Sequence, residues 1–391
     1  MSTAPAPQRI HSIDAVRALA LLGILLVHSH DFCNLSGPKV PPPGALDGIL
    51  NFIYSHFLVT RAFMVFSFLF GLSFFLQMDH ATARGQSFLG RFCWRLILLA
   101  GFGVVHSFFY CGDILIIFAI TGFILVPLWK LPSRIIACLA ALCLLQPLAL
   151  YHALSGTPNA LMDWFQHMWS WLGCTGAPNH QAAGFWEIGT WNLRCGIFSS
   201  LLFTTYSYRI WDILAMFMLG LLAGRARLFE GPPARLWKVA GVSFALWVGI
   251  TLFRLTPAAE GLNIATNMWE KAAFVGICTP LLAWVVGRPC MERVIYPLTQ
   301  MGRCTLTCYI MQSVVMTWLL SGYGLGLRPQ LSITGVILIA LALYAFQLIF
   351  CTVWMRYFRY GPLEGLWRRL TRIGMQKTAP RSPVASTAPM P

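Results

Sequence analysis

The chain has 391 residues, of which 57% are hydrophobic and only 10% charged, and its mean hydropathy is +0.67. So few polar side chains exclude a soluble globular protein and predict an all-α, polytopic bundle of transmembrane helices. The formal net charge is +15, but Lys and Arg recur in short clusters between apolar stretches, without a basic stripe. This pattern predicts membrane topology and argues against a nucleic-acid partner.

Apolar stretches of spanning length predict about ten transmembrane helices with both termini on one side. If that side is the cytoplasm, 20 of the 28 Lys and Arg fall at the inner side and 7 at the outer, with Arg17 inside the first span. Such a bias is typical of the cytoplasmic side. The predicted spans are 13–33, 57–77, 94–111, 113–129, 134–153, 209–225, 236–254, 270–287, 303–320 and 333–355.

The remaining segments complete one membrane domain over residues 9–372. No small-residue cleavage site follows the first apolar stretch, so we expect it to be retained as a span. The short apolar segment 194–208 is expected along the outer surface. Residues 361–372 predict an amphipathic helix on the inner surface, with Glu364 and Arg368 paired. The Pro, Ala and Ser of 376–391 predict a disordered cytoplasmic tail.

The first span carries two ionisable side chains, Arg17 and His28. They are eleven residues apart, which places them on one helix face and roughly 16 Å apart along the axis. The simple interpretation pairs Arg17 with Asp14 and lets His28 bond a neighbouring helix. Because charged groups at membrane depth are costly, we favour a functional role for the pair.

The segment HSFFYCGDIL, residues 106–115, ends one span and begins the next. Asp113 is placed to cap the new helix. His106 is expected at a depth similar to that of His28, so the two histidines would line one cavity if the third span packs against the first.

Three further groups of residues have two interpretations each. Thr305, Tyr309 and Gln312 form a polar stripe that either bonds neighbouring helices or lines a substrate cavity. Arg91, Arg95 and Arg303 either mark the cytoplasmic side or clamp the phosphates of a cofactor. The 12 cysteines lack metal-binding spacing, so we expect no metal. The sequence allows one or two disulfides among Cys33, Cys111, Cys174 and Cys195 but does not define the pairs.

Five segments resemble, in order, the signatures of the DUF418 (YeiB-like) family of bacterial inner-membrane proteins. They are RIHSIDAVRALALLGILLVH, FSFLFG, HSFFYCGDILIIFAITG, GRCTLTCYIMQS and YGPLEGLWRRLT. The resemblance implies a multi-pass protein of the bacterial inner membrane, related to the acyltransferase-3 and heparan-glucosaminide acetyltransferase-like membrane enzymes. Those enzymes carry a basic residue, ten residues and then a histidine in their first span, a spacing that Arg17 and His28 match.

The resemblance implies an O- or N-acyltransferase that moves an acyl group from cytoplasmic acyl-CoA to a small-molecule, glycan or lipid-linked acceptor outside. In this hypothesis His28 is either the general base or a transient carrier of the acyl group. Arg17 and the inner arginines hold the donor, and Asp14, His106 and Asp113 assist. A transporter or exporter of a small polar or lipid-linked solute is the alternative. Membrane lipids are expected partners, and an oligomer is left open.

Overall fold

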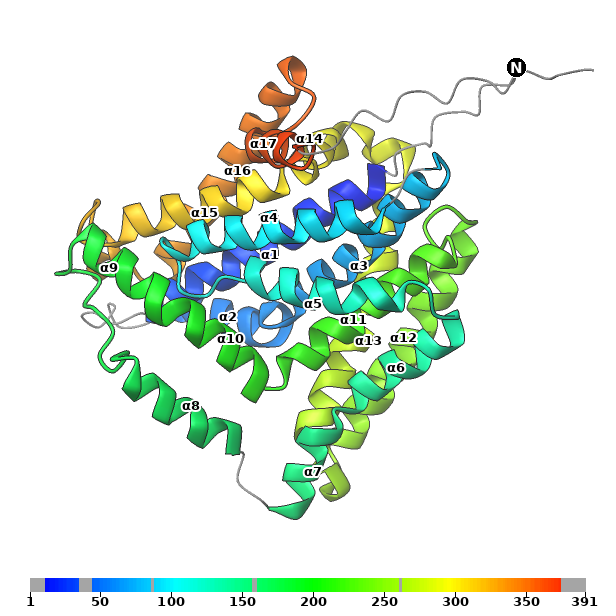
Figure 1. Cartoon of the computed structure of the whole chain (residues 1–391), viewed down its shortest axis with the longest axis horizontal. Coiled ribbons are helices and arrows are strands. Elements are labelled where there is room, and N and C mark those ends of the chain that lie inside the picture. Colours follow the sequence, from blue (N-terminus) through cyan, green and yellow to red (C-terminus); the bar gives the residue numbers. More distant parts are fainter. Residues whose placement is uncertain (1–10, 35–43, 86–87, 157–159, 260–261, 374–391) are drawn as a thin grey trace, which may run out of the picture.

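The computed structural model describes residues 11–34, 44–85, 88–156, 160–259 and 262–373. Throughout these ranges the chain forms helices joined by turns, without any strand, which confirms the predicted all-α class. The predicted tail 376–391 lies outside the described residues. Figure 1 labels the α-helices in chain order: α1 (His11–Asn34), α2 (Ala45–Ile53), α3 (Arg61–Thr82), α4 (Leu89–Ser107), α5 (Leu115–Leu128), α6 (Ser133–Leu145), α7 (Pro147–Ser155), α8 (Ala160–Trp171), α9 (Phe185–Trp191), α10 (Ile197–Tyr206), α11 (Arg209–Arg225), α12 (Pro233–Arg254), α13 (Asn263–Val286), α14 (Glu292–Gly302), α15 (Thr305–Leu320), α16 (Ile333–Tyr357) and α17 (Pro362–Leu370).

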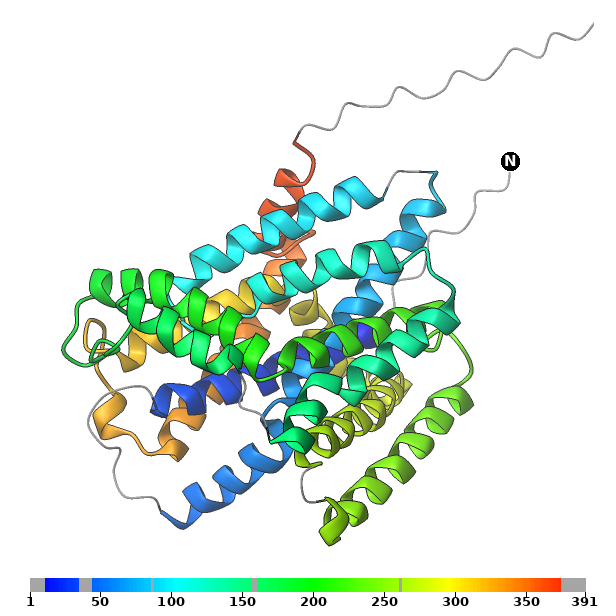
Figure 2. The ribbon, with the colours of Figure 1, turned by 60° about the horizontal axis from the view of Figure 1, so that its bottom comes forward.

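Seven of the described helical segments are long and apolar enough to cross a membrane, or eight if the bent pair ending in α11 counts as one span. The helices α5 and α15, expected to span, are apolar but only 14 and 16 residues long. At the edge of the bundle α12 (yellow-green in Figure 2) exposes Val242, Phe244 and Leu246. Exposed apolar helix surfaces are typical of contact with lipid, so the chain is a helical membrane bundle. The number of ten spans stays a prediction.

The first helix forms the centre of the bundle. It packs against α3, α13, α14, α15 and α16, which explains its interior position in Figure 1. Leu21 and Leu25 are 0% and 1% exposed. Each fully buried leucine stabilises the bundle through close contacts with its neighbours, and such contacts dominate helix association where lipid is the solvent.

Two glycines allow α3 and α11 to pack closely. A Cβ atom built on Gly71 would lie 2.0 Å from the carbonyl oxygen of Phe217, and one on Gly220 would lie 2.0 Å from that of Phe68. No other residue type fits such short separations, so these positions fix the contact between the two helices.

Two helix breaks occur at residues with left-handed backbone angles. Gln146 (φ 47°) separates α6 from α7, so the predicted span 134–153 consists of two helices. Tyr208 (φ 61°) lies between α10 and α11, where the chain bends by 78°. Non-glycine residues rarely adopt these angles, and here the surrounding contacts hold them. The segment 194–208, expected along the surface, therefore contains α10 and leads into this bend.

The predicted amphipathic helix is present as α17, and it packs against α4 and α15. The indole N–H of Trp367 donates to the Arg95 carbonyl (3.2 Å), and the Arg95 guanidinium lies 4.5 Å from the Trp367 ring. We expected Glu364 to pair with Arg368, but the two side chains form no ion pair. Its carboxylate accepts the backbone N–H groups of Leu306 (2.7 Å) and Thr307 (3.1 Å), which caps the start of α15.

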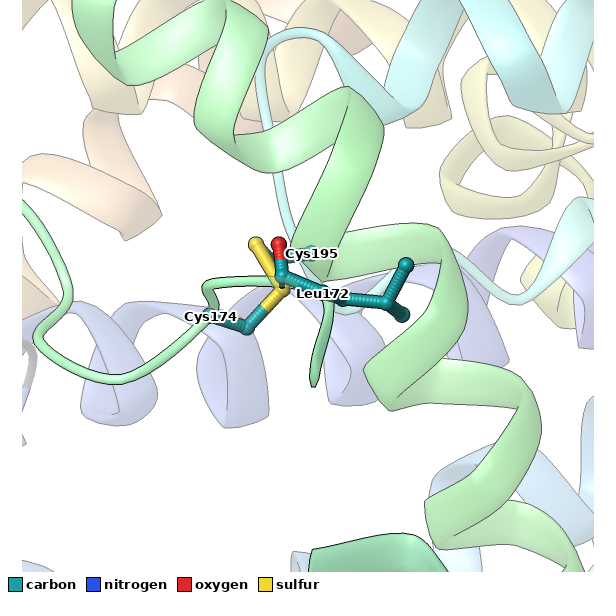
Figure 3. Close-up of a disulfide and its surroundings, with 3 residues drawn as sticks. All are labelled: Leu172, Cys174 and Cys195. Carbon is teal, nitrogen blue, oxygen red and sulfur yellow. Dashed lines mark hydrogen bonds between the residues drawn. A yellow bond between two sulfur atoms is a disulfide. The ribbon is translucent and has the colours of Figure 1, made fainter. Parts of the chain in front are cut away.

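One disulfide joins Cys174, in the turn after α8, to Cys195, in the π-helical turn Asn192–Gly196 (Figure 3). This settles one pairing that the sequence left open. Cys111 carries a free, partly buried thiol, and the side chain of Cys33 lies outside the described residues. The disulfide ties the segment before α9 to the segment that leads into α10.

Candidate functional site

A cavity of about 290 Å³ opens beside the second half of α1, and we call it the His28 cavity. It collects side chains from five parts of the chain. Its wall includes His28 and Asp31 of α1, Phe63 of α3, Tyr110, Cys111 and Asp113 between α4 and α5, Ser199 and Phe203 of α10, and Arg209 of α11.

Local geometry explains why these side chains meet. His28 and Asp31 are three residues apart on α1, so both face the same side. The turn after α4 carries Tyr110 and Asp113 to that side. The bend at Tyr208 brings α10 and the first residue of α11 around the opening.

His28 lies against two tyrosine rings and keeps its nitrogens available. Its ring centroid is 4.4 Å from that of Tyr110 and 5.9 Å from that of Tyr309. Among the described residues neither ring nitrogen has a hydrogen-bond partner. An imidazole that borders a cavity with free nitrogens can take a proton from a bound ligand.

His106, by contrast, is held on both sides and is fully buried. Its Nδ1 atom lies 2.7 Å from Asp113 Oδ1, and its Nε2 atom lies 2.8 Å from Ser313 Oγ. The other oxygen of Asp113 accepts the Ile116 N–H (2.9 Å), so the predicted capping role is confirmed. Nδ1 therefore donates a hydrogen bond to the Asp113 carboxylate, which can only accept, whereas the Ser313 hydroxyl can bond Nε2 as donor or acceptor.

Tyr309 connects the two histidines, because its ring centroid is also 4.7 Å from that of His106. His106 is not part of the wall of the His28 cavity, whereas its partner Asp113 is. Ser313 was missed in the sequence, although it lies four residues after Tyr309 and so continues the polar stripe on α15. The structure brings His28, His106 and Asp113 into one cluster.

The other members of the stripe have different surroundings. The amide of Gln312 donates to Gln347 Oε1 (3.0 Å), and Gln347 donates to the Cys308 carbonyl (2.9 Å). This is the helix-to-helix bonding that the sequence offered as one interpretation. Thr305, Tyr309 and Gln312 line neither of the two cavities described for this bundle.

At the other end of α1, Arg17 donates to Asp14 Oδ1 (2.7 Å) and to the hydroxyl of Ser73. Asp14 is 3% exposed, whereas the Arg17 side chain is partly exposed, so the ion pair is half-buried beside α3. Arg17 lines neither cavity. The pairing within α1 matches the simple interpretation of this arginine.

A second cavity, of about 160 Å³, lies between α3 and α4, and we call it the basic cavity. Its wall contains Gln77, His80, Arg84, Arg91 and Arg95, together with Ala81, Phe88 and Phe92. Three guanidinium groups around so small a volume suit a phosphorylated ligand.

Two of the four predicted cofactor-binding arginines, Arg91 and Arg95, thus share the basic cavity, and Arg84 was missed. Arg303 lies elsewhere, where it donates to Gln300 Oε1 (2.8 Å) and the Arg359 carbonyl (3.0 Å). Charge pattern alone did not distinguish these arginines. Across the described residues no group of three His, Cys, Asp or Glu could hold a metal ion.

The two cavities have no lining residue in common. On α1, the fully buried Leu21 and Leu25 lie between Arg17 and His28. The helix therefore carries an apolar layer between its two polar positions.

Comparisons with known proteins agree with the family resemblance. Residues 223–374 match the family model described as "Protein of unknown function (DUF418)". The chain is 27% identical to the uncharacterized protein YxaH of Bacillus subtilis (strain 168), over 96% of this chain and 98% of that protein. It is 26% identical to the uncharacterized protein YeiB of Escherichia coli (strain K12), over 93% and 96%.

A third relative is an uncharacterized 39.9 kDa protein encoded in the amylase 3' region of Bacillus acidopullulyticus. It is 25% identical over 93% of this chain and 94% of the relative. No solved structure gives a significant match. The chain is therefore similar over nearly its whole length to bacterial proteins, and its C-terminal part matches the DUF418 family model.

Proposed function

We propose that this protein is a member of the DUF418 family in the bacterial inner membrane, and that it transfers an acyl group from cytoplasmic acyl-CoA to an acceptor outside. The observation that carries the proposal is His28, whose ring nitrogens are unpartnered among the described residues and border a cavity of about 290 Å³. A cavity of this size holds a small polar acceptor.

The donor side of the proposal rests on the basic cavity. The guanidinium groups of Arg84, Arg91 and Arg95 would bind the phosphates of the donor, since each can form paired hydrogen bonds with phosphate oxygens. The bias of Lys and Arg toward one side of the predicted spans assigns the segment with Arg84, Arg91 and Arg95 to the inner side, so we expect the basic cavity to face the cytoplasm. The donor then supplies a thioester whose carbonyl carbon is open to attack.

The chemistry assigned to His28 is general base catalysis. Its free nitrogen takes the proton of an acceptor hydroxyl or amine while the acceptor atom forms a bond to the thioester carbonyl carbon. The carbon–sulfur bond then breaks, and His28 returns the proton to the departing thiolate. The products are the acylated acceptor and free CoA thiol. Tyr110 and Tyr309 hold the imidazole in place by ring contact.

His106 serves as a positioning residue in this scheme. Asp113 and Ser313 fix its ring, and its ring in turn packs against Tyr309, one of the rings beside His28. The two cavities have no lining residue in common, so transfer requires the helices between them to separate.

The test uses purified full-length protein in detergent, with radiolabelled acetyl-CoA as donor and release of CoA thiol as the readout. We expect His28→Ala to lower turnover by about 10²- to 10⁴-fold, the usual contribution of a general base. His30 is the matched control on the same helix, because it bonds Asn51 (3.0 Å) outside the cavity. His30→Ala should retain turnover, and equal turnover of His28→Ala and wild type would contradict the proposal.

A transporter of a small polar solute is the second candidate. The observation that favours it is the presence of two cavities that share no lining residue and that both carry charged side chains in their walls. Proteoliposomes loaded with candidate solutes and lacking any acyl donor would discriminate the two. Solute flux that requires His28 but no donor would favour transport, and absence of flux together with thiol release would favour acyl transfer.

A further inference from the structure

Arg209 is the positively charged residue in the wall of the His28 cavity, and the sequence did not suggest it as a site residue. It is the first residue of α11, directly after the bend at Tyr208. Its guanidinium carbon lies 4.9 Å from the ring centroid of Phe63 and 5.1 Å from that of Phe203. Both rings border the same cavity, so the aromatic contacts hold the charge at its wall.

The N–H groups of Arg209 are free within the described part of the chain. No hydrogen bond or ion pair joins Arg209 to a described residue. Other arginines in the bundle are occupied: Arg61 donates to Glu270 (2.6 Å), and Arg225 donates to the carbonyls of Leu131 (2.8 Å) and Trp129. A guanidinium has five N–H donors, and leaving them unused beside a cavity is costly unless a ligand or water takes them.

The nearby carboxylates do not satisfy Arg209. Asp31 accepts the hydroxyls of Tyr54 and Tyr110, each at 3.3 Å, and Asp212 accepts the amide of Gln146. Both acids act on Arg209 electrostatically without forming an ion pair with it. Lys271 adds a second positive charge within electrostatic range. The donor edge of Arg209 is thus left for an anion that enters the cavity.

We propose that the His28 cavity binds an anionic oxygen group, a phosphate or carboxylate, through Arg209. Ring contacts fix the guanidinium, and its fork of donors matches two oxygens of such a group. This inference rests on the proposed acyl transfer. It predicts that the acceptor carries an anionic group beside the hydroxyl or amine that reaches His28. The anion could belong to a soluble small molecule or to a lipid headgroup.

The test measures the thermal unfolding midpoint of the full-length protein in a maltoside detergent, which carries no phosphate. One arm titrates inorganic phosphate and glycerol 3-phosphate, with glycerol as the neutral control. The other titrates a short-chain phosphatidylglycerol, with the matching diacylglycerol as control. We expect saturable stabilisation by phosphate-bearing compounds in at least one arm, and the arm that responds identifies the source.

Arg209→Gln should abolish this stabilisation, whereas Arg194→Gln, which removes an exposed arginine from the π-helical turn before α10, should keep it. Arg209→Lys keeps the charge but not the paired donors, and it should bind about tenfold more weakly. If Arg209→Gln does not fold, the affinity of Arg209→Lys for the phosphate-bearing compounds decides the test. The proposal is overturned by a wild type that responds in neither arm, or by Arg209 variants that bind with the affinity of wild type. Because no acyl donor is present, failure of acyl transfer would leave this result intact.

Discussion

The Nδ1 atom of His106 lies 2.7 Å from the carboxylate of Asp113, and both side chains are buried, at 0% and 2% exposure. Asp113→Ala removes this partner and also the acceptor for the Ile116 N–H. We expect a loss of about 1–3 kcal/mol for the unsatisfied imidazole donor and about 1 kcal/mol for the lost cap. Ser313→Ala, which removes one hydrogen bond, should cost about 1 kcal/mol.

Thermal unfolding of the purified variants checks this order, with Asp113→Ala the least stable. The exposed Asp163→Ala is the control and should unfold like wild type. If Asp113→Ala unfolded at the same temperature as Asp163→Ala, the buried chain from Asp113 to Ser313 would have no structural role.

Gly220 should not tolerate even one added methyl group. Its Cβ would lie 2.0 Å from the Phe68 carbonyl oxygen, so Gly220→Ala must separate α3 from α11. The expected cost is about 1–3 kcal/mol. Gly101 of α4 has nothing within 4 Å of such a Cβ, and Gly101→Ala should leave the unfolding temperature unchanged or raise it. Equal effects of the two substitutions would contradict close packing at Gly220.

Reduction should destabilise the segment before α10. The Cys174–Cys195 disulfide closes a loop with a sequence separation of 21 residues, and a loop of that length contributes roughly 3 kcal/mol. Dithiothreitol should therefore lower the unfolding temperature of wild type, while Cys174→Ser with Cys195→Ser should start lower and not respond. Cys138→Ser, at an exposed free thiol, should respond as wild type does. A wild type unaffected by reduction would rule out a stabilising bond.

His180 predicts a pH dependence of stability. Burial lowers the pKa of His180 below its ordinary value of 6.5, and the charge of Arg328 acts in the same direction. The folded state therefore prefers the neutral ring, so its contribution to stability is complete above pH 6.5 and is lost as pH falls below that value. Unfolding temperatures measured from pH 7.5 to 5 should fall less steeply for His180→Asn than for wild type. His56→Asn, at an exposed ring, should follow wild type.

The long helices could be predicted because hydropathy alone defines them. The expected spans 13–33, 236–254 and 333–355 match α1, α12 and α16 to within three residues at each end. The breaks at Gln146 and Tyr208 could not be predicted, because neither is a residue that normally adopts left-handed angles. Tertiary contacts hold both breaks, and such contacts are not encoded in local periodicity.

The site was predictable only in part, and for the same reason. The helical period placed Arg17 and His28 on one face of α1, and a turn signal identified Asp113. The link from His106 to Ser313 depends on how α15 packs, and the position of Arg209 depends on the 78° bend. Arg17 itself forms the pair with Asp14 that helical spacing suggested, whereas Arg84 could be recognised only once α3 and α4 enclosed a common cavity.

The layer of Leu21 and Leu25 has a consequence for permeability. Both side chains are fully buried on α1 between Arg17 and His28, and close apolar packing of this kind opposes the passage of ions and water. Under the proposed function, a group that passes along α1 must displace this packing without admitting protons. Replacing these leucines with small or polar residues would loosen that barrier.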